Sequence, residues 1–203
     1  MRIIAGEFRS RKLEAPAGMA TRPTSDRLRE TLFNVLAPRI VGATFLDLYA
    51  GSGAVGIEAL SRGATSVVFV ERAPAALAAM RTNLDRLGVK AGFRIHSGSV
   101  GGWRRKASGG ATAFDLVFLD PPYEAGEEYA STLGWLGGGA AGLLAEGALV
   151  IAEHRSRAGR EERLEEQYGC LKRTRVLEQG DAALSFYCTC GAADARGRLA
   201  PTS

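Results

Sequence analysis

The 203-residue sequence contains few of the residues that bind metals or cross-link a chain. Its three cysteines and two histidines do not stand at the spacing of a zinc site. No apolar run approaches the roughly 20 residues that cross a bilayer, and segment 1–6 is too short for a signal peptide. We therefore expect reduced thiols, no bound metal, no membrane association and a cytoplasmic location.

Excess positive charge is absent from most of the chain. The net charge is +4, yet residues 41–203 contain 18 basic and 18 acidic residues, so the whole excess lies in residues 1–40. A concentrated basic segment is typical of nucleic-acid binding, and an aromatic ring among the charges suits an unstacked base. A solvated positive surface is the alternative. The nucleic-acid contacts that we expect are Arg2, Phe8, Arg9, Arg11, Lys12, Arg22, Arg27 and Arg29.

Glycine, in contrast, is abundant, and three of the 26 glycines form one motif. Residues 45–56 read F-L-D-L-Y-A-G-S-G-A-V-G, which predicts a buried strand over 45–49, a glycine turn and the start of a helix. Gly51, Gly53 and Gly56 match G-x-G-x-x-G, in which the backbone passes close to a ligand and helix N–H groups act as donors. The motif indicates a ligand site without naming the ligand.

Two acidic residues narrow the choice of ligand. Glu71 ends the next predicted strand, where dinucleotide-binding proteins place an acid on the ribose. Asp47 lies inside the first strand, and its charge disfavours a pyrophosphate but favours a cation that carries an amino acid group. S-adenosylmethionine, a sulfonium with an ammonium, meets this description; the alternative is that Asp47 only caps the glycine loop. The expected cofactor contacts are Asp47, Tyr49, Ala50, Gly51, Ser52, Gly53, Gly56, Glu71, Arg72, Ser99 and Asp120.

Strands and helices alternate along the rest of the chain, which ends in a hairpin. This order predicts an α/β fold: a doubly wound, Rossmann-like sheet of seven mostly parallel strands, with an antiparallel C-terminal hairpin and a short basic N-terminal extension. We divide the chain into a basic arm and helix (1–40), a cofactor-binding domain (41–190) and a disordered tail (191–203). The expected strands are 45–49, 66–71, 93–96, 114–119, 148–152, 170–177 and 183–190; the expected helices are 27–36, which Pro38 ends, 54–62, 74–87, a short helix within 101–113, 127–136 and 160–168.

The tetrapeptide Asp120-Pro121-Pro122-Tyr123 follows the predicted strand 114–119. Because open α/β sheets bind ligands beyond the carboxyl ends of their strands, it faces the same crevice as the glycine loop. The prolines remove two N–H donors and leave the Asp120 carboxylate and the Pro121 carbonyl as acceptors. Two acceptors can hold both hydrogens of a planar exocyclic amine and aim its nitrogen at a methyl donor, while Tyr123 stacks on the base. A rigid turn with a capping aspartate is the alternative.

With both motifs in place, the chain resembles the class I S-adenosylmethionine-dependent methyltransferases that carry a D/N-P-P-Y/F motif. More closely, it resembles the RsmD family of 16S rRNA guanine-N2 methyltransferases. The resemblance covers about residues 1–190 and is carried by segments 1–6, 22–34 (R-P-T-S-D-R-L-R-E-T-L-F-N), 47–56 and 120–123. It implies that the tetrapeptide Asp-Pro-Pro-Tyr is catalytic.

The resemblance also implies a substrate and partners. The reaction is methyl transfer from S-adenosylmethionine to the N2 amine of a guanine in 16S ribosomal RNA, within the small subunit or its assembly intermediate. Residues 1–40 would recognise the RNA and 41–190 would form the methyltransferase domain, and we expect a monomer. Two features depart from the family: Ser99 stands where an Asp or Asn usually meets the adenine amine, and the tail after Cys190 is unmatched.

Other functions remain open from the motifs. A nicotinamide-dependent oxidoreductase would use the glycine motif and Glu71, but the chain shows no catalytic Lys, Tyr or His pattern for hydride transfer. Methyltransferases of DNA adenine N6 and of protein glutamine N5 use the same tetrapeptide, although the basic arm argues against a protein substrate. A noncatalytic RNA-binding protein would have no need of both motifs.

Overall fold

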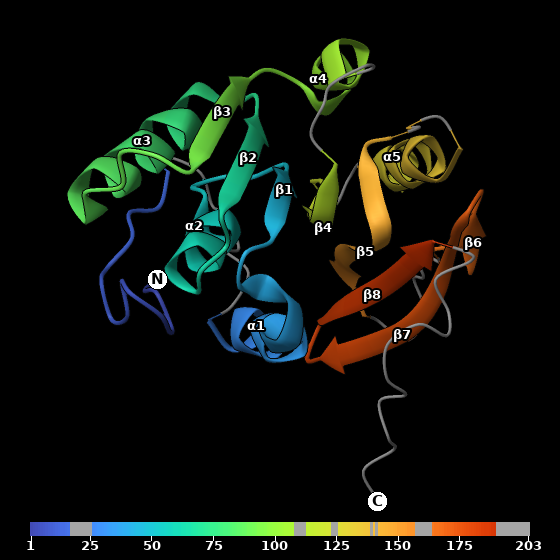
Figure 1. The fold of residues 1–203 in the computed structure, drawn as a ribbon, viewed down its shortest axis with the longest axis horizontal. Helices are drawn as coiled ribbons and strands as arrows, with labels where there is room; N and C mark the ends of the chain where they lie inside the picture. The colour runs from blue at the N-terminus through green and yellow to red at the C-terminus, as the bar shows by residue number, and fades with distance from the viewer. Residues whose placement is uncertain are drawn as a thin grey trace, which may run out of the picture.

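The computed structural model of the chain describes residues 1–16, 26–107, 113–122, 126–138, 140, 142–156 and 164–189. They form one eight-stranded sheet in the order β3-β2-β1-β4-β5-β8-β7-β6, with helices on both faces (Figure 1). The strands are β1 (Thr44–Leu48), β2 (Ser66–Glu71), β3 (Phe93–Ser97), β4 (Phe114–Leu119), β5 (Leu144–Arg155), β6 (Gln167–Tyr168), β7 (Leu171–Gln179) and β8 (Ala182–Thr189). The helices are α1 (Asp26–Ile40), α2 (Ala54–Ser61), α3 (Pro74–Leu87), α4 (Val100–Ala107) and α5 (Gly126–Gly138).

The five strands β1 to β5 are parallel, and the chain reverses its direction of winding at β1. It moves from β1 outward to β2 and β3, then returns to place β4 on the other side of β1. Such a reversal opens a crevice beyond the carboxyl ends of the two central strands. β8 is antiparallel to both β5 and β7, so the predicted fold is confirmed, and the two-residue β6 is an additional edge strand.

Two sequence-based helix predictions are wrong, one at its C-terminal boundary and the other in its type of structure. Pro38 does not end α1, which continues to Ile40. Ile40 is 3% exposed, and its burial stabilises the last turn although the proline removes one N–H donor. The helix expected over 160–168 is wrong in its described part, because Gln167 and Tyr168 pair with β7 as strand β6. Residues 160–163 and the expected tail lie outside the described residues.

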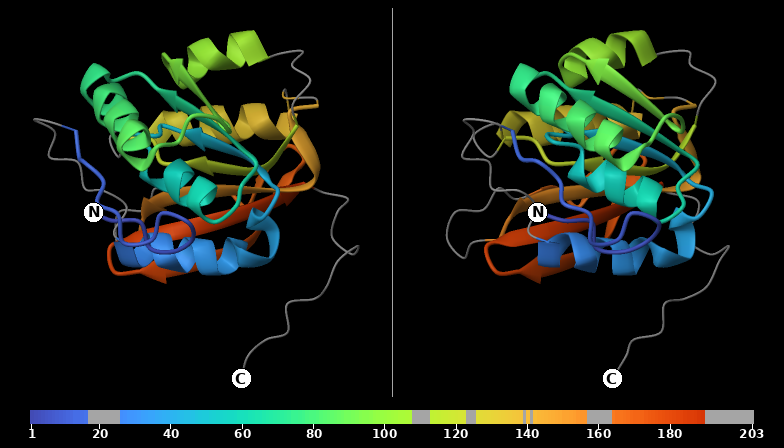
Figure 2. Two further views of the ribbon diagram at one scale, coloured as in Figure 1. Left: turned by 60° about the vertical axis from the view of Figure 1, so that its left-hand side comes forward. Right: turned by 90° about the vertical axis from the view of Figure 1, so that its left-hand side faces the viewer.

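Two hydrophobic cores lie on opposite faces of the sheet. Helices α1, α2 and α3 pack on one face, and α4 and α5 pack on the other (Figure 1). The first core also includes Ile3 and Leu13 of the N-terminal arm, which are 1% and 6% exposed. Figure 2 shows the arm running beside α1 and α2. Residues 1–16 therefore pack as part of the domain, because their apolar side chains complete its core.

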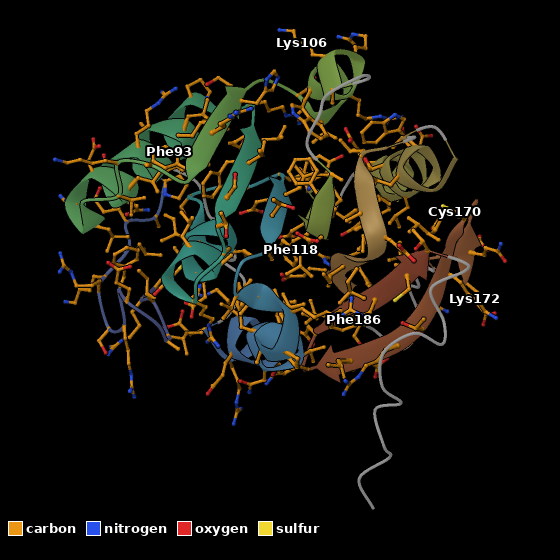
Figure 3. The ribbon with its side chains drawn as sticks, viewed as in Figure 1. Phe93, Lys106, Phe118, Cys170, Lys172 and Phe186 are labelled. Carbon is orange, nitrogen blue, oxygen red and sulfur yellow. The ribbon has the colours of Figure 1, made fainter. Side chains whose placement is uncertain are left out.

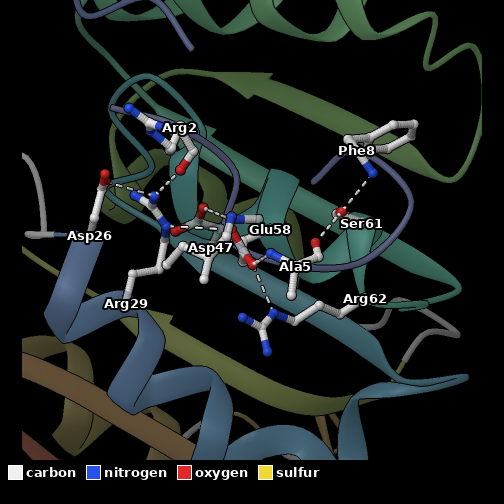
Figure 4. A network of polar contacts seen from close by, with 11 residues as sticks. Arg2, Ala5, Phe8, Asp26, Arg29, Asp47, Glu58, Ser61 and Arg62 are labelled. Carbon is white, nitrogen blue, oxygen red and sulfur yellow. Dashed lines mark hydrogen bonds and ion pairs between the residues drawn. The ribbon is translucent and has the colours of Figure 1, made fainter. Parts of the chain in front are cut away.

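Two residues of α2, Glu58 and Ser61, hold the arm through its backbone (Figure 4). The fully buried Glu58 accepts hydrogen bonds from the N–H groups of Ile4 and Ala5 at 2.8 and 3.0 Å. Ser61 accepts two further N–H groups of the arm, through its carbonyl oxygen at 2.8 Å and its hydroxyl at 3.0 Å. Gly6 has a φ of 84°, and a Cβ there would lie 1.8 Å from the Ser61 carbonyl oxygen. Only glycine permits this close approach of the arm to α2.

Arg29 of α1 completes this network and corrects one expected RNA contact. It is fully buried, and its guanidinium pairs with Glu58 at 3.6 Å and with Asp26 at 3.0 Å. It also donates a hydrogen bond to the carbonyl oxygen of Arg2, while Arg62 pairs with Glu58 at 2.7 Å (Figure 4). A buried and paired guanidinium does not reach a phosphate, so the prediction that Arg29 binds RNA is wrong.

We expect Glu58→Ala to destabilise the fold strongly. The substitution leaves the buried charge of Arg29 uncompensated and removes the acceptor for two N–H groups of the arm. Breaking such a pair lowers the free energy of unfolding by about 3–5 kcal/mol, measurable by urea denaturation. The control Glu7→Ala, at an exposed position of the arm, should stay within about 0.5 kcal/mol of the wild type. Equal unfolding midpoints for the two variants would contradict this role of Glu58.

Candidate active site

The chain turns sharply between β1 and α2, and its glycines serve different purposes. Gly51 and Gly53 have φ values of 55° and 79°, and Tyr49 before them has a φ of 61°. A Cβ at Gly56 would lie 2.2 Å from the Phe69 ring, so this glycine lets α2 pack closely on β2. A Cβ at Gly51 would meet no atom within 4 Å. Gly51 therefore leaves its backbone open to a ligand.

Two acidic side chains hold this loop from opposite sides. Asp47 is 1% exposed and accepts the N–H of Gly56 at 2.9 Å. Glu71, at the end of β2, accepts the N–H of Gly51 at 2.8 Å and those of the two residues after itself at 2.7 Å each. Both acids thus anchor the loop, as the capping alternative for Asp47 expects, and their contacts with a cofactor stay predictions. Three other expected cofactor residues lie on this loop or just after β2: Ala50, Ser52 and Arg72.

Four carboxyl groups gather near the carboxyl ends of the central strands. The register of β4 and β5 places Asp120 beside the buried Glu153. Burial raises the pKa of Asp47 to about 7, opposed by its backbone hydrogen bond and reinforced by the charge of Glu71. Burial also raises the pKa of Asp120 well above its ordinary value, and the charges of Glu153 and Asp47 add to the rise. These carboxylates repel one another, so the crevice favours a cation over an anion.

This electrostatic character distinguishes the two candidate cofactors. S-adenosylmethionine brings a sulfonium and an ammonium, both of which relieve the repulsion among the acids. A nicotinamide dinucleotide brings a pyrophosphate, which would add two negative charges beside Asp47. The residues present therefore fit S-adenosylmethionine, and they argue against the oxidoreductase alternative.

Tyr49 connects the glycine loop to α5. Its phenol donates to the Glu128 carboxylate at 2.5 Å and lies 2.9 Å from the Thr132 hydroxyl. Burial and the bond to Glu128 raise the pKa of Tyr49, which keeps the phenol protonated as a donor. The sequence alone does not single out Glu128, Thr132 or Glu153. The two α5 residues stand four apart on the predicted helix 127–136, but only the fold shows that this face meets Tyr49.

The tetrapeptide after β4 is described only in part. Asp120 is partly exposed at the crevice, Pro121 is buried and Pro122 is exposed, whereas Tyr123 lies outside the described residues. Ser99 is exposed, and its hydroxyl caps α4 by accepting a backbone N–H at 3.1 Å. An adenine contact would share this hydroxyl with the cap, so that contact stays a prediction.

The expected RNA-binding residues of the arm differ in their exposure to solvent. Phe8 is half-buried, and its ring already packs against the first core, while Arg22 lies outside the described residues. A groove of about 340 Å³ lies between the arm and α1, where three arginines stand with Asp26 and Glu30. The exposed basic residues are Arg2, Arg9, Arg11, Lys12 and Arg27.

The described residues form neither a metal cluster nor a membrane span. Among them, no three His, Cys, Asp or Glu side chains are grouped as metal ligands would be. No helix of the described segments is both long and apolar enough to cross a membrane.

The strand order, with its winding reversal at β1, is that of the class I S-adenosylmethionine-dependent methyltransferases. The chain is a member of this enzyme class. Its family follows from the sequence: residues 1–188 match the family described as Conserved hypothetical protein 95, and the chain belongs to that family.

Relatives of known name agree with this assignment. The chain is 36% identical over 187 residues to "Putative rRNA methyltransferase YlbH" of Bacillus subtilis strain 168, covering 92% of this chain and 98% of that protein. It is 43% identical over 141 residues to "Ribosomal RNA small subunit methyltransferase D" of Escherichia coli strain K12, covering 67% and 69%. The solved structure of "Putative methyltransferase yhhF from Escherichia coli" matches with a TM-score of 0.77 and 37% identity over 93% of this chain and 97% of that one. The likeness therefore extends over nearly the whole chain.

We expect the affinity for S-adenosylmethionine to rise with pH up to about pH 7 and then to level off. In the free protein the raised pKa keeps Asp47 largely protonated below pH 7, and a cationic ligand must release that proton to gain the charge. Linkage then gives a rise of up to about tenfold per pH unit, measurable by calorimetry between pH 5.5 and 8.5. Asp47→Asn should flatten the profile. A profile that Asp47→Asn leaves unchanged would refute the electrostatic assignment.

Proposed function

We propose that this methyltransferase transfers the methyl group of S-adenosylmethionine to the exocyclic N2 amine of a guanine in 16S ribosomal RNA. The observation that carries the proposal is the position of Asp120 at the end of β4, which pairs directly with the strand that leads into the glycine loop. The two relatives named for ribosomal RNA methylation and the basic arm support this substrate. The proposal includes the small subunit or its assembly intermediate as the particle bound, a monomer as the active form and a cytoplasmic location.

The loop and its anchoring acids form the cofactor site in this proposal. Gly51 leaves free space for the cofactor beside the loop, and Asp47 supplies negative charge to the methionine end of the cofactor. Glu71 is assigned to the ribose hydroxyls and Ser99 to the adenine. When bound, the cofactor supplies an electrophilic methyl group.

Asp120 and Pro121 position the target amine. The Asp120 carboxylate and the Pro121 carbonyl oxygen accept the two hydrogens of the amine, and Tyr123 stacks on the guanine. Positioning of this kind lowers a reaction barrier by up to roughly 7–11 kcal/mol. As the nitrogen gains the methyl group it must lose a proton, and an ionised Asp120 with a raised pKa accepts protons better than an ordinary aspartate.

The choice of acceptor is tested by one assay. Tritiated S-adenosylmethionine is incubated with the enzyme and with 16S ribosomal RNA, double-stranded DNA or protein as acceptor, and the labelled nucleoside is identified after digestion. We expect label on N2-methylguanosine from the ribosomal RNA. Label on adenine of DNA or on protein glutamine, with none on RNA, would replace the proposed substrate by one of the alternatives.

Asp120→Ala should remove most of the activity and change the affinity for the cofactor far less than it changes kcat. The residue is assigned to the amine, so its loss should lower kcat by at least about 100-fold, the usual effect of removing a proton-transfer group. Single-turnover rates and calorimetry with S-adenosylmethionine separate the two effects. Glu146→Ala, at an exposed position of β5, serves as the control. Methyl transfer by Asp120→Ala at the wild-type rate would show that this residue does not position the amine.

The arm is tested by charge substitution, since Ile3 and Leu13 belong to the core and a deletion would disturb the fold. Arg9→Gln with Lys12→Gln should weaken RNA binding and make its salt dependence shallower by about 0.7 log units for each phosphate that the variant no longer binds. The same two measurements on Lys172→Gln with Arg175→Gln, exposed on β7, give the control. If the two double variants bind RNA equally weakly, the effect is one of net charge and the arm has no special part in RNA binding.

A further inference from the structure

A second groove lies between α4 and α5, away from the arm. It has a volume of about 400 Å³ and is lined by Gly101, Arg104, Arg105 and Trp135. The Arg104 guanidinium lies 4.9 Å from the centre of the Trp135 ring. Trp103, which is 8% exposed, meets Trp135 edge to face with ring centres 5.9 Å apart. The groove therefore presents a partly exposed indole that is held between a buried ring and a cation.

The charge around this groove is of one sign. The last turn of α4 carries Arg104, Arg105 and Lys106, and α4 contains no acidic residue. After Glu128, α5 contains no charged residue at all. Lys106 points away from the sheet (Figure 3). Basic residues in a last turn complement the helix dipole, but the dipole does not call for an aromatic ring beside them. Positive charge next to an aromatic platform is the combination that binds single-stranded nucleic acid.

Helix α5 connects the groove to the acidic crevice. Ser131 of α5 accepts a hydrogen bond from Arg104 at 3.0 Å, and Glu128 one turn earlier binds Tyr49 of the glycine loop. At a rise of 1.5 Å per residue, Trp135 lies roughly 10 Å along α5 from Glu128. Because α4 and α5 cover one face of the sheet and the arm packs on the other, exposed basic residues lie over both faces of the sheet.

We propose that the groove between α4 and α5 is a second RNA-binding site, which holds a nucleotide of single-stranded RNA beside the target guanine. The base stacks on the pair formed by Arg104 and Trp135, and the phosphates on either side lie near Arg105 and Lys106. This inference rests on the proposed function, since it takes RNA as the substrate. Stacking tolerates any base, so the groove adds affinity and orients the strand without choosing the target.

Tryptophan fluorescence tests the site directly, because the chain has two tryptophans and Trp103 is buried. The enzyme loaded with S-adenosylhomocysteine is titrated with protein-free 16S ribosomal RNA. We expect quenching in the wild type, and loss of most of the quenching in Trp135→Phe, which keeps a ring for packing and stacking. Trp135→Ala should raise the Kd about 5- to 150-fold, the effect of removing one stacking platform.

A second pair of variants tests the charges without touching the core. Arg105→Gln with Lys106→Gln removes two exposed cations and should make the salt dependence of binding shallower by about 0.7 log units for each phosphate no longer bound. Lys172→Gln with Arg175→Gln again serves as the matched control. If Trp135→Ala does not fold, this double variant and the reduced quenching in Trp135→Phe decide the question.

The outcomes distinguish a failure of the groove proposal from a failure of the proposed function. A wild-type enzyme that neither binds nor methylates RNA would overturn both. A wild-type enzyme that methylates RNA, with Trp135→Ala and the double variant unchanged in Kd and salt dependence, would overturn the groove alone. Defects seen only with assembled small subunits, and not with protein-free RNA, would assign the groove to a protein contact and would also overturn the inference.

Discussion

A backbone N–H group that is shielded from water needs an acceptor, and the two irregular segments, the N-terminal arm and the glycine loop, contain several shielded N–H groups outside regular secondary structure. Three carboxylates supply the acceptors. Glu58 binds the arm, while Asp47 and Glu71 bind the glycine loop from its two sides. Helix α2 begins at the loop and carries Glu58, so it ties the loop to the arm, and Arg29 ties α1 to the same carboxylate. The geometry of the crevice depends on these anchored N–H groups, because neither segment has regular secondary structure to hold it.

The same acids give the molecule a separation of charge that its net charge does not reveal. Inside the crevice, burial together with the charges of Glu153 and Asp47 raises the pKa of Asp120, and burial together with the charge of Glu71 raises the pKa of Asp47. Outside it, exposed cations lie on the arm and on α4. A cationic cofactor matches the interior and the phosphates of RNA match the exterior. A crevice that is acidic inside and basic outside disfavours entry of a polyanionic backbone into the cofactor site.

The count of charged residues along the sequence revealed only part of this charge distribution. It treats every arginine of residues 1–40 alike, yet Arg29 lies in the interior with Glu58 and Asp26 as partners. It also shows residues 41–203 as neutral, which hides the three basic residues in the last turn of α4. The helix expected over 160–168 failed for a related reason: strand β6 exists because Gln167 and Tyr168 find a partner in β7, and no local pattern reveals that pairing.

The sequence by itself determined the alternating strands and helices, the glycine turn after β1, the C-terminal hairpin and the position of Asp120 at the end of β4. Each of these follows from periodicity or turn chemistry within a short window of residues, and topology rules then order the strands. Only the tertiary structure decided that Arg29 is buried, that Glu58 holds the arm, that Glu153 lies beside Asp120 and that Trp135 forms a groove with α4. Burial and ion pairing depend on which distant residues come together, as Ile4 and Arg29 do with Glu58, and that information lies in the packing of the whole chain.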